Sequence, residues 1–199
     1  MQLDIGDRRA GDAARAGIAG ALTGCVGPHP KYGRGVYWAK EHEGFPPTTL
    51  SLGTCLLDWG LVDEFKTRLG YYFERFVKSD GTFNYYGPAL AEYGQLLDLA
   101  AACARRTDDT AWYEKHRPAI DRIIDRLLHQ REQSCRARPR DALTYGLLSG
   151  SAEADTASHQ DYFLSGNVWC WRGLAETGAV FVLLGRKKTD DALARRGQE

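Results

Sequence analysis

The chain has 199 residues, of which 43% are hydrophobic, and it carries 26 basic and 26 acidic side chains. A chain of this length can bury one hydrophobic core, so we expect a single domain. Its formal net charge of zero leaves no basic surplus to hold phosphates, so no nucleic-acid partner is predicted.

The distribution of apolar residues predicts neither a membrane-spanning segment nor a secretory signal. The longest apolar stretches, such as residues 179–184, are far shorter than the ~20 residues that span a bilayer, so we expect no membrane partner. Residues 1–15 mix Asp with Arg and lack the apolar core of a secretory signal, which predicts a cytoplasmic protein. The five cysteines form no CxxC or Cys/His cluster, as expected of buried thiols in a reducing compartment.

The first half of the chain predicts helices joined by short turns. Residues 10–24 are rich in small side chains and form the first expected helix. From Thr48, a good N-cap, apolar residues recur at helical spacing until Gly60 stops the pattern. Another helix starts at once and ends at the turn 78–81, and two helices separated by one glycine must fold back as an αα-hairpin.

A second hairpin is predicted next. Pro88 fits the first position of a helix, and the following helix carries an apolar stripe from Trp112 to Leu128, with Pro118 expected to bend or restart it. Residues 130–145 are rich in arginine at their start and predict an exposed connector. Any strands are expected to be short pieces, such as 35–38 and 82–86.

The segment 146–174 holds the strongest functional signal. A glycine-rich loop with Glu153 and Asp155 runs into an amphipathic helix, expected over 162–184, and a short helix follows at 189–199. Sugars stack on aromatic rings, and glycosidic cleavage usually takes a pair of carboxyl groups. Carboxylates and aromatic residues also stand before the two earlier hairpins, at 37–45 and 83–93. If the hairpins pack around a common axis, these loops gather at one end and form the site.

Together the pattern resembles the six-hairpin glycosidases, the (α/α)6-barrel superfamily that includes glucoamylase-like, trehalase-like, rhamnosidase-like and glycogen-debranching-like enzymes. The resemblance covers roughly residues 32–186. It rests on the order of four features. The first is the helix, glycine, helix and Asp-Gly turn of 48–80, and the second is the aromatic loop and helix of 86–97. The third is residues 107–112 with the later Pro118, and the fourth is the pair of segments 152–155 and 162–174.

The resemblance implies an all-α fold of αα-hairpins in a toroid, and an enzyme that inverts the anomeric centre with one carboxylic acid and one carboxylate base. The implied proton donor is Glu153 or Asp155, and the base is Glu92 or Glu43 or lies outside this chain. The implied sugar-binding residues are Trp38, Glu41, Glu43, Tyr86, His159, Tyr162, Asn167, Trp171 and Arg172.

The length departs from the family pattern. Twelve helices with their connections need on the order of 300 residues, whereas this chain predicts about three hairpins, or half a barrel. We therefore expect either a fragment of a longer protein or a barrel completed by a missing half or a second copy, because open helix faces are rarely left exposed.

Other functions stay open. A toroidal polysaccharide lyase or sugar epimerase would use His159 with Tyr162 and Arg172 to move a proton. A non-catalytic helical module that binds carbohydrate or another protein is the third interpretation. His42 and His159 lack the spacing of a metal site, and no phosphate loop is present, so we expect neither a metal nor a cofactor.

Overall fold

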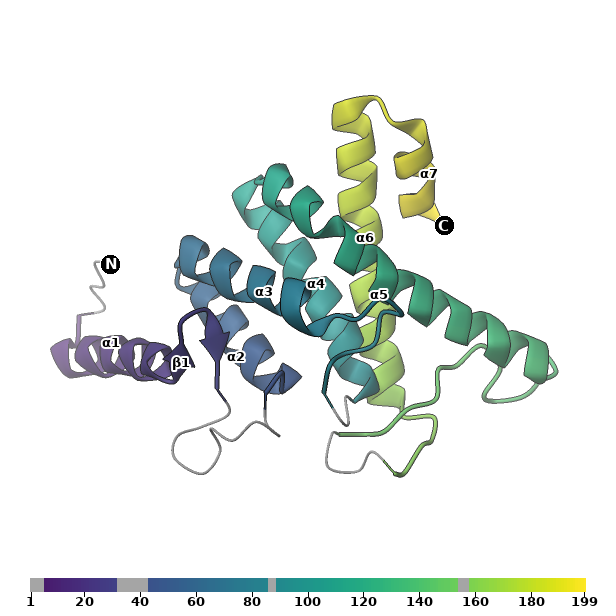
Figure 1. The fold of residues 1–199 in the computed structure, drawn as a ribbon, viewed down its shortest axis with the longest axis horizontal. Coiled ribbons are helices and arrows are strands. Elements are labelled where there is room, and N and C mark those ends of the chain that lie inside the picture. The colour runs from purple at the N-terminus through teal and green to yellow at the C-terminus, as the bar shows by residue number, and fades with distance from the viewer. Residues whose placement is uncertain (1–5, 32–42, 86–88, 154–157) are drawn as a thin grey trace.

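A computed structural model describes residues 6–31, 43–85, 89–153 and 158–199 of the protein (Figure 1). The expected all-α fold is confirmed at this level, since the described residues form seven helices and one short two-stranded ribbon. In chain order they are α1 (Arg8–Thr23), β1 (Cys25–Val26), β2 (His29–Pro30), α2 (Pro46–Asp58), α3 (Val62–Phe76), α4 (Leu90–Thr107), α5 (Thr110–Ala137), α6 (Leu164–Lys188) and α7 (Asp191–Gln198).

The first predicted hairpin is formed by α2 and α3. Gly60 adopts a φ of +71°, a left-handed conformation that glycine reaches without strain, and it lets the chain reverse within two residues. The Leu61 N–H then donates to the Leu56 carbonyl at 2.8 Å, which closes the turn. The two helices pack against each other, so the hairpin predicted from this glycine is confirmed.

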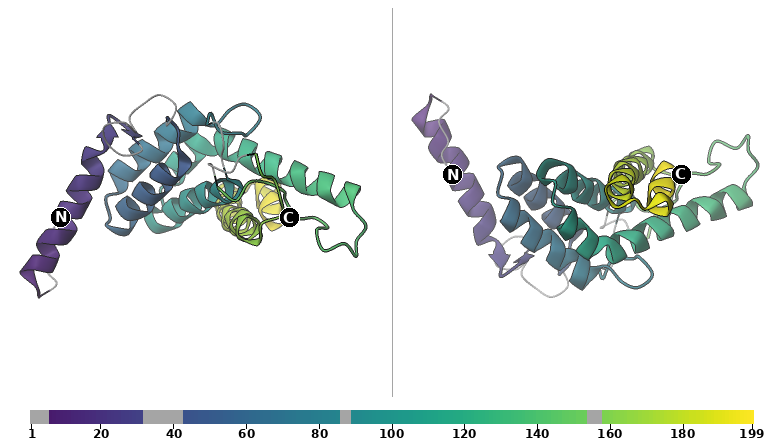
Figure 2. Two further views of the ribbon diagram at one scale, coloured as in Figure 1. Left: turned by 90° about the horizontal axis from the view of Figure 1, so that it is seen from below. Right: turned by 90° about the horizontal axis from the view of Figure 1, so that it is seen from above.

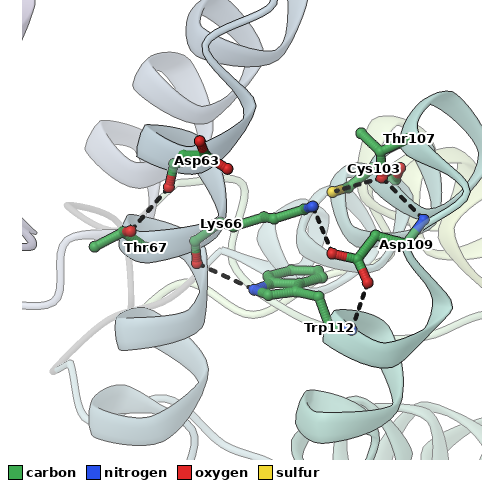
Figure 3. A network of polar contacts seen from close by, with 7 residues as sticks. All are labelled: Asp63, Lys66, Thr67, Cys103, Thr107, Asp109 and Trp112. Carbon is green, nitrogen blue, oxygen red and sulfur yellow. Dashed lines mark hydrogen bonds and ion pairs between the residues drawn. The ribbon is translucent and has the colours of Figure 1, made fainter.

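The second hairpin, α4 with α5, turns at two aspartates. Asp108 takes a left-handed φ of +53° at the end of α4, and the Asp109 carboxylate caps α5 by accepting the Trp112 N–H at 3.0 Å. Figure 3 shows how this cap also ties α5 to α3. The Lys66 ammonium reaches Asp109 at 2.6 Å, and the Trp112 indole N–H donates to the Lys66 carbonyl at 3.2 Å.

Several boundaries differ from the expectation. Helix α5 continues without interruption through Pro118 and ends only at Ala137, so the first half of the predicted connector 130–145 is helical. This is a correction: the charged side chains are mostly exposed, as predicted, but they extend a helix. The ribbon of β1 and β2 was not predicted. In the predicted strand 82–86, of which the structure describes residues 82–85, Phe83 alone among these forms a bridge, with Val77. The predicted strand 35–38 lies outside the described residues.

The core lies between α2, α3, α4, α5 and α6. Aromatic residues of α3 fill one side of it, and leucines and isoleucines of α4 and α5 fill the other. The closest packing joins α4 to α6, where Gly94 faces the backbone at Trp169 and Gly173 faces the backbone at Gly94. A Cβ on either glycine would collide with main-chain atoms of the opposite helix, so these two glycines permit direct backbone contact.

Helix α1 lies apart from this core. Figure 2 shows it extending from one end of the molecule, while the C-terminal end of α5 projects at the other. Ile18 is the only large apolar side chain of α1 that is buried, and most other residues of that helix are exposed. Within the described part of the chain, no helix is both long and apolar enough to cross a membrane.

Candidate functional site

Three loops and helix starts meet at one end of the molecule. The N-terminal ends of α2, α4 and α6 all lie at the lower edge of Figure 1, whereas α3 and α5 run in the opposite direction. The alternation follows from the hairpins, since each turn reverses the chain. Residues that precede every second helix are therefore brought together, although they are separated by about 45 to 110 positions in the chain.

An open cleft of about 360 Å³ lies at this end. Its walls come from the start of α2, the first two turns of α4 and the loop before α6. The residues that line it are Phe45, Pro47, Leu50, Ser51, Ala89, Ala91, Glu92, Gln95, Ala152 and Glu153. Two of the three carboxyl groups predicted to be catalytic, Glu92 and Glu153, thus line one cleft.

Glu92 is a buried acid at the third position of α4. Its side chain is 4% exposed, and one carboxylate oxygen accepts the N–H of Ala89 at 2.9 Å. Burial raises the pKa of Glu92 to about 8, because the ionised form loses its hydration, and the hydrogen bond from Ala89 offsets only part of this effect. The Glu92 side chain therefore caps its own helix and also holds a proton at neutral pH.

Glu153 occupies the exposed wall of the cleft. Its loop is closed by a pair of backbone hydrogen bonds between Gly150 and Asp161, at 2.9 and 3.0 Å. The same loop is anchored to α4, since the Leu90 N–H donates to the Ser151 carbonyl at 3.3 Å. These contacts fix the base of the loop on the helix that carries Glu92.

Three other residues of the cleft were not among the predicted site residues. Phe45 supplies an aromatic face, and its ring lies 5.4 Å from that of Tyr85. Gln95, one helical turn after Glu92, adds an amide, and Ser51 adds a hydroxyl. The i, i+3 spacing of Glu92 and Gln95 was the available signal, because residues so spaced share a helix face.

Other predicted site residues are held by structural contacts. The Asn167 amide clamps Leu148, accepting its N–H at 2.8 Å and donating to its carbonyl at 3.0 Å. Arg172 pairs with Asp98 at 3.2 Å. The Tyr162 hydroxyl accepts a hydrogen bond from Arg138. None of these three side chains lines the cleft of Glu92.

The last candidates are scattered or undescribed. Glu43 pairs with Lys31 at 2.8 Å, and His159 is exposed beside Phe163, with a ring separation of 6.0 Å. Trp171 is 70% exposed and lines a different hollow. Four candidates lie outside the described residues: Trp38, Glu41, Tyr86 and Asp155. In the described ranges, no group of three or more His, Cys, Asp or Glu side chains is placed to hold a metal ion.

Comparisons with known proteins found no relative of this chain. No protein-family model, no curated protein and no solved structure matches this chain.

Proposed function

We propose that the protein acts on carbohydrate and that the cleft of Glu92 and Glu153 hydrolyses a glycosidic bond. The observation that carries the proposal is the pairing of a buried and an exposed carboxyl group in one cleft. Glycoside hydrolysis requires two such groups in different protonation states, one to donate a proton and one to activate water or attack the sugar.

The environments favour Glu92 as the proton donor. A carboxyl group with a pKa of about 8 is protonated at neutral pH and can give its proton to a leaving oxygen. Glu153 lies on the exposed wall, where water has access, and is assigned as the second carboxyl group. This differs from the roles expected from the family resemblance, in which Glu153 or Asp155 donates the proton and Glu92 is one of the candidates for the base.

The remaining lining supports a sugar as the ligand. Phe45 offers a ring on which a pyranose can stack, and Gln95 and Ser51 offer hydrogen bonds to hydroxyl groups. The alternating helix directions, with the starts of α2, α4 and α6 at one end, agree with an incomplete (α/α) toroid. Under the proposal, a missing half or a second copy would complete it.

The proton-abstracting alternative has less support. A lyase or epimerase of this kind needs His159, Tyr162 and Arg172 near one substrate, and the latter two have Arg138 and Asp98 as partners outside the cleft. A non-catalytic module would not require a buried carboxyl group with a raised pKa, although the capping bond gives Glu92 a structural role as well.

Product release from a panel of 4-nitrophenyl α- and β-glycosides and from short glucan oligosaccharides tests the proposal. We expect Glu92→Gln to lower kcat at least ~100-fold, since general acid catalysis contributes about 10² to 10⁴. The Gln side chain keeps an oxygen for the Ala89 N–H, so the helix start is preserved. Glu132→Gln, which changes an exposed carboxylate on α5, is the matched control and should keep full activity.

The pH profile and the product anomer separate the outcomes. With Glu92 as the acid, kcat/KM should fall as the pH rises above about 8, and Glu92→Gln should remove this limb. An inverted product would correspond to carboxyl groups ~6.5–9.5 Å apart. If the unmodified protein neither cleaves any of these compounds nor binds the sugars in calorimetric titration, the proposal is wrong.

A further inference from the structure

A second surface, independent of the cleft, lies on the side of α6 that faces away from α4. Residues 164, 168, 171, 175, 178 and 182 follow one another at alternating steps of four and three, so they share one face of the helix. Leu164, Val168, Trp171 and Ala175 make up the N-terminal half of this seam. Gly178 and Val182 belong to its C-terminal half.

The C-terminal half of the seam is already a helix-docking surface. Helix α7 packs along it, and the backbones of Gly178 and Gly197 touch, since a Cβ on either glycine would collide with the carbonyl oxygen of the other. Figure 1 shows α7 beside the upper half of α6, with its C-terminal end pointing down toward the lower half. Residues 191–198 therefore cover the C-terminal half of the seam.

The N-terminal half is exposed. Leu164 is 76% exposed, Val168 51% and Trp171 70%. The last two line a hollow of about 900 Å³ between α5, α6 and the end of α7, which Leu128 of α5 also lines while 47% exposed. Contiguous apolar surfaces of this kind usually mark an interaction site. The heptad-like spacing and the packing of α7 indicate that a helix is the matching partner.

We propose that the partner is α6 of a second copy of this chain, packed antiparallel across a two-fold axis between positions 169 and 170. This register places Val168 opposite Trp171 of the second copy, and Leu164 opposite its Ala175. A large side chain thus meets a smaller one at both levels of the N-terminal half of the seam, so this half is complementary to itself, as a two-fold interface requires.

The end of α7 agrees with the same register. Gln198, Glu199 and Ala175 all line the hollow, and the register places the first turn of the second α6 at the level of Ala175. That first turn contains no acidic residue, and its N-cap, Phe163, provides no side-chain hydrogen bond. A carboxylate is favourable at a helix N-terminus. Glu199 of each copy would supply one to the other.

Solution mass is the first test. Size-exclusion chromatography with light scattering should give twice the chain mass of 22.2 kDa at tens of micromolar protein. Trp171→Glu should give a monomer, because it places a charge in the centre of the interface. Leu143→Glu is the matched control: Leu143 is 97% exposed in the loop after α5 and does not line the hollow, so this variant should remain dimeric.

Disulfide trapping tests the register. In a background where Cys25, Cys55 and Cys135 are Ser, a mixture of Leu164→Cys and Ala175→Cys chains should cross-link on oxidation. Leu164→Cys alone should not, since its two copies would lie ~16 Å apart along the axis, at 1.5 Å per residue, whereas bridged Cα atoms lie within about 7 Å.

Three results would overturn the proposal. The first is a monomer at ~100 µM protein for the unmodified chain. The second is an equal mass for Trp171→Glu and Leu143→Glu, with circular dichroism showing that both are folded. The third is cross-linking of Leu164→Cys alone as readily as of the mixture, which would place some other contact at this surface.

Discussion

At the residue scale, Glu92 couples the candidate site to stability. The carboxyl group is buried, and its pKa is about 8 in the folded chain against an ordinary value of 4.5. An acid whose pKa is raised by folding does not destabilise the folded chain while it is protonated in both the folded and the unfolded state. The loss in free energy of unfolding grows as the pH rises above the unfolded pKa, and it is complete above the folded pKa.

We therefore expect Glu92→Gln to become progressively more stable than the unmodified chain between pH 5 and pH 9. The difference in free energy of unfolding should grow by up to about 5 kcal/mol, at about 1.4 kcal/mol per pKa unit. Urea unfolding at pH 5, 7 and 9 measures it. A difference that is constant with pH would contradict the raised pKa.

A second prediction at the residue scale concerns the close contact of Gly94 with α6. Gly94→Ala should lower the free energy of unfolding by about 3 kcal/mol, because the new methyl group would meet the backbone of α6 at Trp169 and Cys170 and push the two helices apart. Thermal unfolding measures the change, expected at roughly 6–12 °C for a chain of this size. The control is Gly17→Ala in α1, where the added Cβ meets no atom within 4 Å. That change should be neutral or stabilising by up to ~1 kcal/mol.

At the element scale, the hairpins depend on their turns and caps. Asp109 serves two elements at once, since it caps α5 through the Trp112 N–H and holds Lys66 of α3 (Figure 3). The pKa of Asp109 is lowered, chiefly by the hydrogen bond from Lys66 and also by the cap. Its stabilising effect is therefore present above the ordinary aspartate pKa and is lost as the pH falls through the folded value.

Two substitutions separate these roles. Asp109→Ala removes the cap and the ion pair and should cost about 1–2 kcal/mol. Asp109→Asn keeps an oxygen for the Trp112 N–H and removes only the charge, so it should cost about half as much or less, because a single ion pair that water still reaches contributes little. Denaturant unfolding at pH 7 distinguishes the two. Equal losses would mean that the ion pair, and not the cap, is the important contact.

At the scale of the whole molecule, the helices near the two ends of the chain contribute unequally to stability. Helix α1 buries Ile18 but is otherwise largely exposed, whereas α7 buries Leu193 and covers Phe181 and Gly178 of α6. Stability follows buried apolar area. The terminal helix α7 is half as long as α1 and yet belongs to the packed body.

Removal of residues 1–24 should therefore lower Tm by less than about 4 °C, corresponding to about 1 kcal/mol. Removal of residues 189–199 should lower it several times as much, because Phe181 and the C-terminal half of the α6 seam become exposed to water. Scanning calorimetry of the two shortened chains makes the comparison. A larger loss for the N-terminal deletion would mean that α1 packs more tightly than its exposure indicates.

The sequence by itself determined the local structure. The helical spacing of apolar residues predicted most helices to within a few residues, and Gly60 predicted the first hairpin, because periodicity and turn chemistry act over neighbouring residues. The helical spacing did not predict residues 130–137, because this polar segment carries no apolar stripe. These residues continue α5, and the buried residues that hold this helix in the core lie earlier in it, between Tyr113 and Leu127.

Tertiary structure alone decided which distant residues meet. The close packing of α4 against α6 depends on two glycines 79 positions apart, Gly94 and Gly173. Each of them leaves room for the backbone of the opposite helix, a requirement that becomes visible only when the two helices are packed together. The assembled fold also buries Glu92, which raises its pKa, and it places Glu153 in the same cleft. Residue types in the sequence named both carboxyl groups as candidates, but burial is a property of the assembled helices, and so the difference between the buried Glu92 and the exposed Glu153 is decided only by the fold.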